Sequence, residues 1–324
     1  MARTMSQAVS LLFERHLIWL LLLVLVLFGS TVQGFTSLQN ILNVMWAAAP
    51  LGCMVLGLFL VLLIKEVDLS LESTFAFAPT IAIVAMLQWW PDGLPPIVAA
   101  IATPLLGLLV GAAQGAFAVT LRVNAFLVTL ATLLLMRGFV IFLIPEGVYY
   151  LPDAYTYLGE RRLVGVPVAI FVWLLLYLAA FVFIERHRLG KEIYAIGNNE
   201  EAAFLAGVKV QRTKILCFAI AGFAAALGGL LEVGRLQSVV ADLGQGQILM
   251  VFAGTILGGT SLSGGIGRLS GVFAAVIVIA LIENIMNLVG IEPSIRQIVF
   301  GLVLLLAIYL ASLQDRFALR ALSR

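Results

Sequence analysis

The chain has 324 residues, of which 62% are hydrophobic and 11% are charged, and its mean hydropathy is +1.12. Soluble domains are about half apolar and about a quarter charged, so this composition excludes an ordinary water-soluble protein and predicts an integral membrane protein. The net charge of +2 is too small for a nucleic-acid-binding surface.

Apolar runs long enough to cross a bilayer follow one another along the chain, separated by clusters of glycine, proline and charge. They predict an all-α, polytopic membrane bundle of about ten transmembrane helices, in a single domain over residues 1–324. The first run resembles a signal-peptide core, but it lacks a convincing cleavage site and is expected to be retained. The expected spans are Leu17–Gln33, Val44–Ile64, Ser73–Trp90, Ile97–Leu121, Ala125–Ile144, Val168–Ile184, Ile215–Leu236, Gln247–Leu262, Ser270–Val289 and Gln297–Leu313.

The distribution of basic residues indicates how the spans are oriented, because cytoplasmic loops carry an excess of Lys and Arg. With an internal N-terminus, about fourteen of the 19 basic residues fall on the cytoplasmic side, so both termini are expected there. The charged stretch Lys65–Ser73 either separates two full spans or interrupts one discontinuous helix. The outer loop Pro145–Pro167, rich in tyrosine, is interpreted either as a surface for a soluble partner or as an interfacial aromatic belt.

The longest cytoplasmic loop, at about residues 185–214, contains the sequence YAIGNNEEAAFLAGV. Asn198 is expected to cap a helix of about two turns, with Glu201 at the capping-box position and Gly207 at a left-handed C-terminal stop. So short a helix is marginal alone in water, so it must pack against something else. Its apolar residues Ala203–Leu205 could contact a partner protein, or the helix could lie on its own membrane domain.

Polar residues within the spans are candidates for a solute path, because ionisable groups at membrane depth are costly and usually functional. Plainer interpretations stay open: Asp68 could cap the following helix, Lys65 could neutralise Glu66, and amides could hold helices together. The three-residue spacing of Glu232 and Arg235 favours an ion pair within one helix. The path candidates are Asp68, Ser70, Asn124, Thr129, Thr132, Glu283, Asn284 and Asn287.

Motifs for ATP hydrolysis and for enzyme chemistry are absent from the sequence. No G-x-x-x-x-G-K-[ST] phosphate loop occurs, because Gly190-Lys191 is followed by Glu192, so energy from ATP would have to enter through another polypeptide. No G-x-S-x-G motif occurs, and the few histidines and cysteines cannot build a zinc site. The glycine run Gly258–Gly267 is interpreted as a close helix approach with a tight turn. We therefore expect neither a catalytic residue nor a metal site.

Four segments together resemble the permease subunits of ABC importers, in the ribose, xylose and autoinducer branch. The first segment is similar to the E-A-A-x-x-x-G loop of these permeases, since Glu201-Ala202-Ala203 is followed by three residues and then by Gly207. LGGTSLSGGIGR at Leu257–Arg268 is similar to the most specific segment of the branch. EVDLSLES at Glu66–Ser73 resembles the motif G-I-D-L-S-x-G-S, and NAFLVTLATLLLMRG at Asn124–Gly138 fits as well. The resemblance covers roughly residues 35–313.

This resemblance implies a multi-pass permease of the bacterial inner membrane that moves a monosaccharide or polyol by alternating access. Its implied partners are ABC ATPase subunits that hold ATP and Mg, a second permease subunit, a periplasmic sugar-binding protein and membrane lipid, with no cofactor in this chain itself. The family's glycine-rich segment maps to Gly258, Gly259, Thr260, Ser261, Gly264 and Gly265. The residues implied to dock on the ATPase are Asn198, Asn199, Glu200, Glu201, Ala202, Ala203, Phe204 and Gly207.

Two departures from the branch pattern add carboxylates near the presumed path: Glu66 stands where glycine is common, and Glu283 precedes Asn284. They leave the exact substrate open, including a polyol or an amino-bearing sugar. From the residues alone, an ion-gradient-driven secondary transporter that uses Glu66, Asp68 or Glu283 is the alternative. A membrane scaffold that transports nothing is a third class.

Overall fold

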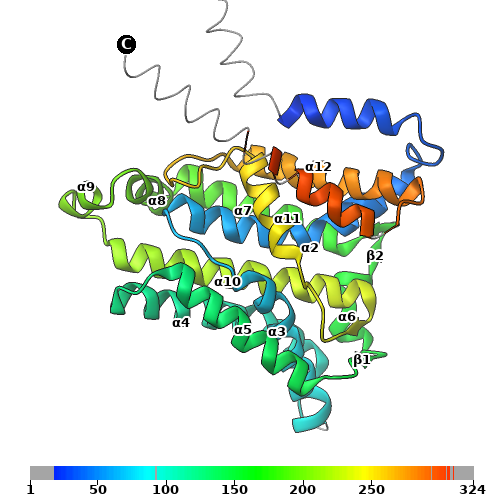
Figure 1. Ribbon diagram of the computed structural model, residues 1–324. Helices are drawn as coiled ribbons and strands as arrows, with labels where there is room; N and C mark the ends of the chain where they lie inside the picture. Colours follow the sequence, from blue (N-terminus) through cyan, green and yellow to red (C-terminus); the bar gives the residue numbers. More distant parts are fainter. Residues whose placement is uncertain (1–17, 92, 293, 304, 307–308, 310–324) are drawn as a thin grey trace, which may run out of the picture.

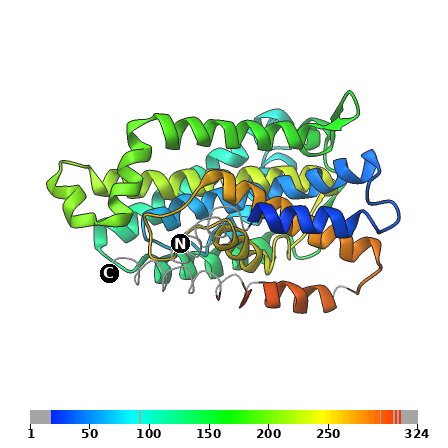
Figure 2. The same cartoon turned by 90° about the horizontal axis from the view of Figure 1, so that it is seen from above.

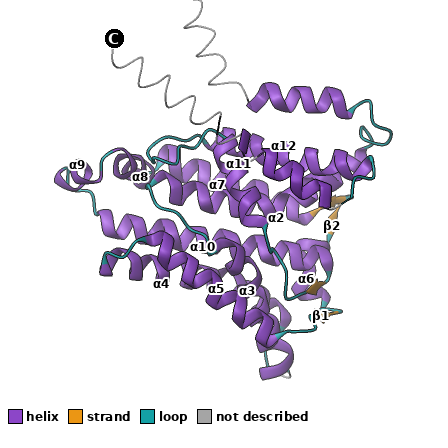
Figure 3. Ribbon diagram, in the orientation of Figure 1, coloured by secondary structure: helices purple, strands orange, loops and turns teal. Residues whose placement is uncertain are grey.

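The computed structural model describes residues 18–91, 93–292, 294–303, 305–306 and 309 of the chain. Over these residues the fold is helical apart from two short antiparallel ribbons (Figure 3). One ribbon pairs β1 (Val148–Tyr149) with β4 (Ser238–Val239), and the other pairs β2 (Arg162–Leu163) with β3 (Val166–Pro167). Leu17 of the first expected span and residues 304, 307–308 and 310–313 of the last lie outside the described residues.

The helices follow the expected apolar runs closely (Figure 1). They are α2 (Leu38–Leu63), α3 (Leu71–Val84) with a π-helical end η1 (Ala85–Trp89), α4 (Pro96–Leu121), α5 (Ala125–Leu143), α6 (Asp153–Glu160), α7 (Val168–Arg186), α8 (Arg188–Asn198), α9 (Glu200–Leu205), α10 (Val210–Leu236), α11 (Gln247–Leu257) and α12 (Leu269–Leu288). Shorter apolar helices cover Ile18–Gly29 and Ser294–Val303. In Figure 2 the helix Ile18–Gly29, in dark blue, lies beside the orange α12, on which it packs.

Seven helices in the described part of the chain are long and apolar enough to cross a membrane: α2, α3 with η1, α4, α5, α7, α10 and α12. These helices confirm the prediction of an all-α, multi-pass membrane bundle. The expected span Gln247–Leu262 is too long, because α11 ends at Leu257 and its 11 residues reach only about 16 Å. A bilayer core of about 30 Å needs nearly twice that length. Gly258 ends the helix and Gly259 turns the chain with a φ of 84°.

The charged stretch after α2 separates two helices rather than interrupting one. α2 ends at Leu63, residues 65–70 are extended or turned, and α3 begins at Leu71. Figure 1 shows this extended segment folding back toward the middle of the bundle, so that α3 begins among its neighbours rather than at the end of the molecule. We call residues 64–70 the re-entrant segment.

Helix α10 lies at the centre and packs on α2, α3, α4 and α6. Its contact with α4 is made by glycines at four-residue spacing, Gly107 and Gly111, which meet the backbone of α10. A Cβ atom at Gly107 would overlap the carbonyl of Gly222, and one at Gly111 would overlap the carbonyl of Phe218. Small residues of this kind let two membrane helices approach backbone to backbone. The α4–α10 pair is therefore a closely packed seam of the bundle's frame.

We expect Gly111→Leu to force α4 away from α10, because the new side chain has no space against a backbone carbonyl. Overpacking of this kind costs about 1–3 kcal/mol or more. The melting temperature of the detergent-solubilised protein, followed by size-exclusion chromatography after heating, should fall. Gly138→Leu in α5 is the matched control, since nothing lies within 4 Å of a Cβ atom there. Equal melting temperatures for the two variants would contradict this account of the seam.

The bundle has two distinct ends in Figures 1 and 2, with α8 and α9 at one end and α6 with the β-ribbons at the other. The loop of residues 145–167 at the α6 end is more deeply embedded than the sequence indicated. Tyr155 is fully buried, and its hydroxyl lies 3.0 Å from that of Thr103 in α4. Tyr150, in contrast, is 98% exposed. Part of this loop is therefore core, whereas Tyr149, Tyr150 and Tyr157 are exposed.

Candidate functional site

The predicted loop helix exists as α9, but its cap is one residue later than expected. Asn199 is the N-cap, and its side-chain oxygen accepts a hydrogen bond from the Ala202 N–H at 2.9 Å. Asn198, the predicted cap, is instead the last residue of α8, a helix that the sequence analysis did not anticipate. Because the cap moves by one residue, Ala202 takes the third helical position and Glu201 cannot complete a capping box.

Gly207 ends α9 as predicted, in the left-handed conformation with a φ of 84°. The Gly207 N–H donates to the Phe204 carbonyl at 2.9 Å, and the Val208 N–H donates to the Ala203 carbonyl at 3.0 Å. These two bonds form a Schellman motif, which glycine makes without steric cost. Phe204 and Leu205 are 66% and 79% exposed, whereas Ala203 is buried. The predicted apolar face therefore loses Ala203, which packs inward on the chain itself.

Helix α8 anchors α9 to the end of α2 and to the glycine-rich segment. The Asn198 amide donates to the Gly265 carbonyl at 3.3 Å, and the Gly265 N–H donates to the Leu63 carbonyl at 2.9 Å. A Cβ atom at Gly197 would overlap that same Leu63 carbonyl. Three backbones therefore meet at one point, which explains why glycine occupies two of the positions.

The glycine-rich segment is a compact turn, as the sequence predicted. Gly259, Gly264 and Gly265 all have φ between 70° and 84°, and the Ser261 N–H closes the turn on the Ile266 carbonyl at 2.9 Å. Gly258 abuts the backbone of α12, and Thr260 is buried with no hydrogen-bond partner for its hydroxyl among the described residues.

Tyr194 of α8 adds a side-chain bond to this junction. Its hydroxyl donates to the Gly267 carbonyl at 2.9 Å. Burial, together with the nearby Glu185 carboxylate, raises the pKa of the Tyr194 hydroxyl above its usual value.

A buried lysine joins α9 to the re-entrant segment. The Lys214 ammonium, near the start of α10, lies 2.8 Å from a Glu200 carboxylate oxygen and 2.8 Å from a Glu66 carboxylate oxygen. Its side chain is only 10% exposed. The interpretation that Lys65 neutralises Glu66 is therefore wrong, because Lys214 does so from another helix. No local spacing in the sequence pairs residues this far apart.

The re-entrant segment is held at depth by a cluster of buried polar groups. The Asp68 carboxylate accepts hydrogen bonds from the Ser70 N–H at 2.8 Å, the Ser70 hydroxyl at 2.6 Å and the Gln114 amide at 2.8 Å. Thr129 of α5 accepts from the Leu69 N–H at 3.2 Å. Three of the predicted path residues, Asp68, Ser70 and Thr129, thus lie together. Both oxygens of Asp68 are already occupied, which favours a fixing role for this carboxylate.

Two other predicted path residues have local roles. Asn124 is exposed and caps α5, accepting from the Phe126 N–H at 2.9 Å. Thr132 donates within its own helix to the Val128 carbonyl at 2.9 Å. Asn124 also borders a groove of about 1510 Å³ beneath α9, formed by residues 65–67, 122–126 and 207–212 together with parts of α4, α9 and α10.

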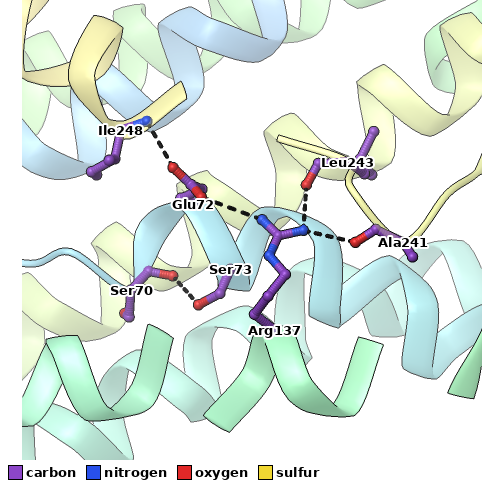
Figure 4. A network of polar contacts seen from close by, with 7 residues as sticks. All are labelled: Ser70, Glu72, Ser73, Arg137, Ala241, Leu243 and Ile248. Carbon is purple, nitrogen blue, oxygen red and sulfur yellow. Dashed lines mark hydrogen bonds and ion pairs between the residues drawn. The ribbon is translucent and has the colours of Figure 1, made fainter. Parts of the chain in front are cut away.

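A second buried ion pair holds the loop between α10 and α11 (Figure 4). The Glu72 carboxylate lies 3.5 Å from the Arg137 guanidinium and accepts from the Ile248 N–H at the start of α11 at 3.1 Å. Arg137 also donates to the carbonyls of Ala241 and Leu243 at 3.0 and 2.9 Å. A carboxylate at a helix N-terminus is favourable because it satisfies free N–H groups and the helix dipole.

Replacing Arg137 by methionine should leave Glu72 buried without its cation and release two loop carbonyls. Loss of one partner of a buried pair costs about 3–5 kcal/mol. Hydrogen exchange of residues 238–246 should then increase sharply. Arg188→Met is the matched control, since its side chain in the Arg188–Glu192 pair is 81% exposed. Unchanged exchange in the Arg137 variant would show that the loop is held by other contacts.

The remaining path candidates lie toward the other end of α2, about 18–30 Å along that helix from its last residue, Leu63. Glu283, Asn284 and Asn287 share one face of α12 and line a cavity of about 440 Å³. We call it the α2–α12 cavity. Its other lining residues come from α2, α10 and α11: Asn43, Val44, Trp46, Ala47, Pro50, Leu51, Glu232, Arg235, Gln247 and Met250, with Ala280 of α12.

Within this cavity, the predicted Glu232–Arg235 pair is confirmed, with contacts of 2.6 and 3.0 Å. Asn284 and Asn40 exchange two amide hydrogen bonds, of 2.8 and 3.0 Å. The sequence analysis missed Trp46 and Asn43, because an aromatic residue and an amide at the start of an apolar helix are not distinctive without the neighbouring helices.

These features define a polytopic membrane protein with polar groups buried between helices and a short exposed helix at one end, the form of a transport permease. Residues 40–308 match the family described as branched-chain amino acid transport system / permease component. The chain therefore belongs to this family of ABC-importer permeases, and the prediction of a transport subunit rather than an enzyme is confirmed. Membership implies an ATPase and a binding protein as partners and does not favour the secondary-transporter alternative.

Several characterised proteins are similar over most of their length. The ribose import permease protein RbsC of Escherichia coli (strain K12) is 33% identical over 293 residues, covering 89% of this chain and 90% of that protein. RbsC of Bacillus subtilis (strain 168) is 30% identical, with the same coverage of 89% and 90%. The L-arabinose transport system permease protein AraH of Escherichia coli (strain K12) is 33% identical over 282 residues, covering 86% of this chain and 84% of that protein. No solved structure matches the chain.

Proposed function

We propose that this chain is the membrane permease of an importer for a monosaccharide or related polyol, delivered by a periplasmic sugar-binding protein. The ribose and L-arabinose relatives support a sugar as the cargo. The observation that carries the proposal is α9, which offers exposed Phe204 and Leu205 to a partner and is tied by Lys214 to the buried re-entrant segment. ATP and Mg belong to the partner ATPase, since this sequence has no phosphate loop.

The α9 end is proposed to face the cytoplasm of a bacterium, with the chain in the inner membrane and both termini on the cytoplasmic side. Its connecting loop, at about residues 185–214, carries six lysine and arginine residues, and cytoplasmic loops are enriched in such residues. The α2–α12 cavity then lies toward the periplasm. These six residues are Arg186, Arg188, Lys191, Lys209, Arg212 and Lys214.

The docking element is proposed to comprise Asn198, Asn199, Glu200, Glu201, Ala202, Ala203, Phe204 and Gly207. The geometry supports a division of labour among them. Asn199 and Gly207 shape the ends of α9, Ala203 and Glu200 hold it to the chain, and the exposed Phe204 is left for the partner. A short helix whose inner face is fixed to its own chain and whose apolar residue is exposed can transmit a movement of the partner, because the helix cannot shift relative to the residues beneath it.

Coupling is proposed to run from α9 through Lys214 to Glu66 and the re-entrant segment. When the partner ATPases bind nucleotide and close, α9 moves with them. Because Lys214 binds both Glu200 on α9 and Glu66 on the re-entrant segment, this movement pulls the segment that carries Asp68. Nucleotide shifts the permease only if it binds one conformation of the assembly more tightly. The solute route is proposed to connect the α2–α12 cavity with the groove beneath α9, beside Ser70, Asn124, Thr129 and Thr132.

The assembly is proposed to contain two permease chains, as a homodimer or with a similar permease, in contact with membrane lipid. Each chain contributes a single transmembrane domain over residues 1–324, with the cytoplasmic loop at about 185–214 as its contact with the ATPase.

Docking is tested by Phe204→Asp and Gly207→Val in proteoliposomes that contain the ATPase partner and the liganded binding protein. Uptake of a labelled pentose should fall at least about tenfold, since an interface anchor contributes about 2 kcal/mol or more. Membrane insertion should be unchanged. The exposed Lys191→Ala on α8 is the control. Normal uptake by both variants, or uptake driven by an ion gradient without the ATPase, would overturn the proposal.

Coupling is tested by Lys214→Met, which removes the shared cation but keeps an unbranched side chain. We expect ATPase activity of the assembled complex to lose its stimulation by the liganded binding protein. Lys214→Arg should retain most of the stimulation, because a guanidinium can also join two carboxylates. Glu66→Gln and Glu200→Gln each leave one ion pair and should give intermediate values. Full stimulation in Lys214→Met would rule out the link.

A further inference from the structure

We propose that the α2–α12 cavity is a solute-binding site for an uncharged polyhydroxyl compound, with the Glu283 carboxylate as the main acceptor of its hydroxyl groups. This inference rests on the proposed function, which assigns the cavity end of the bundle to the periplasmic side. The cavity volume of about 440 Å³ lies within the range of small-molecule sites.

The first argument is the balance of charge in the cavity. Arg235 is its only cation among the described lining residues, and both contacts of that guanidinium are with Glu232, at 2.6 and 3.0 Å. Glu283 makes no hydrogen bond to any described residue. Arg235 also acts on Glu283 electrostatically, without a hydrogen bond or ion-pair contact to it. Arg296 acts on Glu283 in the same way but is not part of the lining, and its Nε donates to the Ile291 carbonyl. The lining therefore carries one carboxylate in excess.

The second argument concerns the two asparagines of α12 in the cavity, of which one is hydrogen-bonded within the protein and the other is available to a ligand. Asn284 is fully engaged with Asn40, so it positions the helix face rather than binding solute. Asn287, one turn further along α12, has no side-chain partner in the described structure and can donate and accept. A carboxylate and an amide on the same face, neither of them hydrogen-bonded to a described residue, can together bind adjacent hydroxyl groups.

The third argument concerns Trp46, whose aromatic ring is held rigidly at the cavity wall. Its indole N–H donates to the Gly159 carbonyl at 2.7 Å, and the Arg162 guanidinium lies 5.3 Å from the ring centroid. A ring that is fixed before binding loses little conformational entropy when a solute packs on it. Because a sugar has apolar C–H faces between its hydroxyl groups, it can use both this ring and the polar groups opposite.

This chemistry separates two candidate cargoes, sugars and branched-chain amino acids. The carboxylate of an amino acid needs an unneutralised cation or several free N–H donors, and the cavity offers a neutralised Arg235 and an excess negative charge instead. Acidic solutes are disfavoured for the same reason. Hydroxyl groups are donors that a carboxylate accepts well, and such charge-assisted bonds are about twice as strong as neutral ones. An amino-bearing sugar would also be tolerated.

The test uses the assembled transporter in lipid nanodiscs, without the binding protein, and equilibrium binding of labelled D-ribose, L-arabinose, a polyol panel, leucine and glucuronate. At least one neutral polyhydroxyl compound should bind, and leucine and glucuronate should not. Glu283→Gln should weaken that binding about tenfold, the effect of losing one charge-assisted hydrogen bond. Glu283→Asp should retain part of the affinity. Glu292→Gln is the matched control, because that carboxylate is exposed just beyond α12 and does not line the cavity.

The outcomes distinguish the two levels of inference. If ATP-dependent sugar uptake occurs but Glu283→Gln binds the solute as tightly as the unaltered chain, the cavity assignment is wrong and the importer stands. If leucine binds in a manner that depends on Glu283, the assigned solute class is wrong. If neither uptake nor binding of any sugar is found while the ATPase partner is active, the proposed function fails as well. Normal elution of each variant on size-exclusion chromatography excludes misfolding as the cause of lost binding.

Discussion

One buried ammonium group connects the exposed end of this protein to its interior. Lys214 stands near the beginning of α10 with its side chain 10% exposed, and an unpaired cation in such a place is costly. Its two carboxylate partners come from different parts of the fold, Glu200 on α9 and Glu66 on the re-entrant segment. Because one charge is shared, neither partner can be displaced without disturbing the other. A contact on α9 therefore has a physical route to the polar cluster around Asp68.

That route matters because the surrounding frame is rigid. α4 and α10 meet backbone to backbone at Gly107 and Gly111, where no side chain could yield. The Glu72–Arg137 pair fixes the start of α11 and the loop before it, so the short helix keeps its position without spanning the bundle. Against this frame, the extended residues 64–70 lack a helical hydrogen-bond ladder and are held by side chains instead. Movement is therefore easiest to accommodate there.

Structural features that depend only on residues close together in the sequence were predictable from the sequence. The Gly207 stop and the Glu232–Arg235 pair depend on residues within one helical turn, and both appear as expected. The cap of α9 was misplaced by one residue, because Asn198 and Asn199 have the same capping chemistry and only the unexpected helix α8 distinguishes them. Likewise, α11 is apolar enough for a span but is cut short by glycines that the turn requires.

The sequence by itself determined that the chain is a multi-pass helical membrane protein, which of its segments are helical, and which permease branch it resembles, because apolar run length and short motifs are properties of contiguous residues. Only the tertiary structure decided that Lys214 neutralises Glu66 and that Asp68 is saturated by Ser70 and Gln114. It also decided that Glu283 accepts no hydrogen bond from any described residue, in a cavity beside Trp46. Each of these depends on which helices lie side by side. Apolar surfaces pack in many ways, so a linear pattern of hydrophobicity does not specify these neighbours.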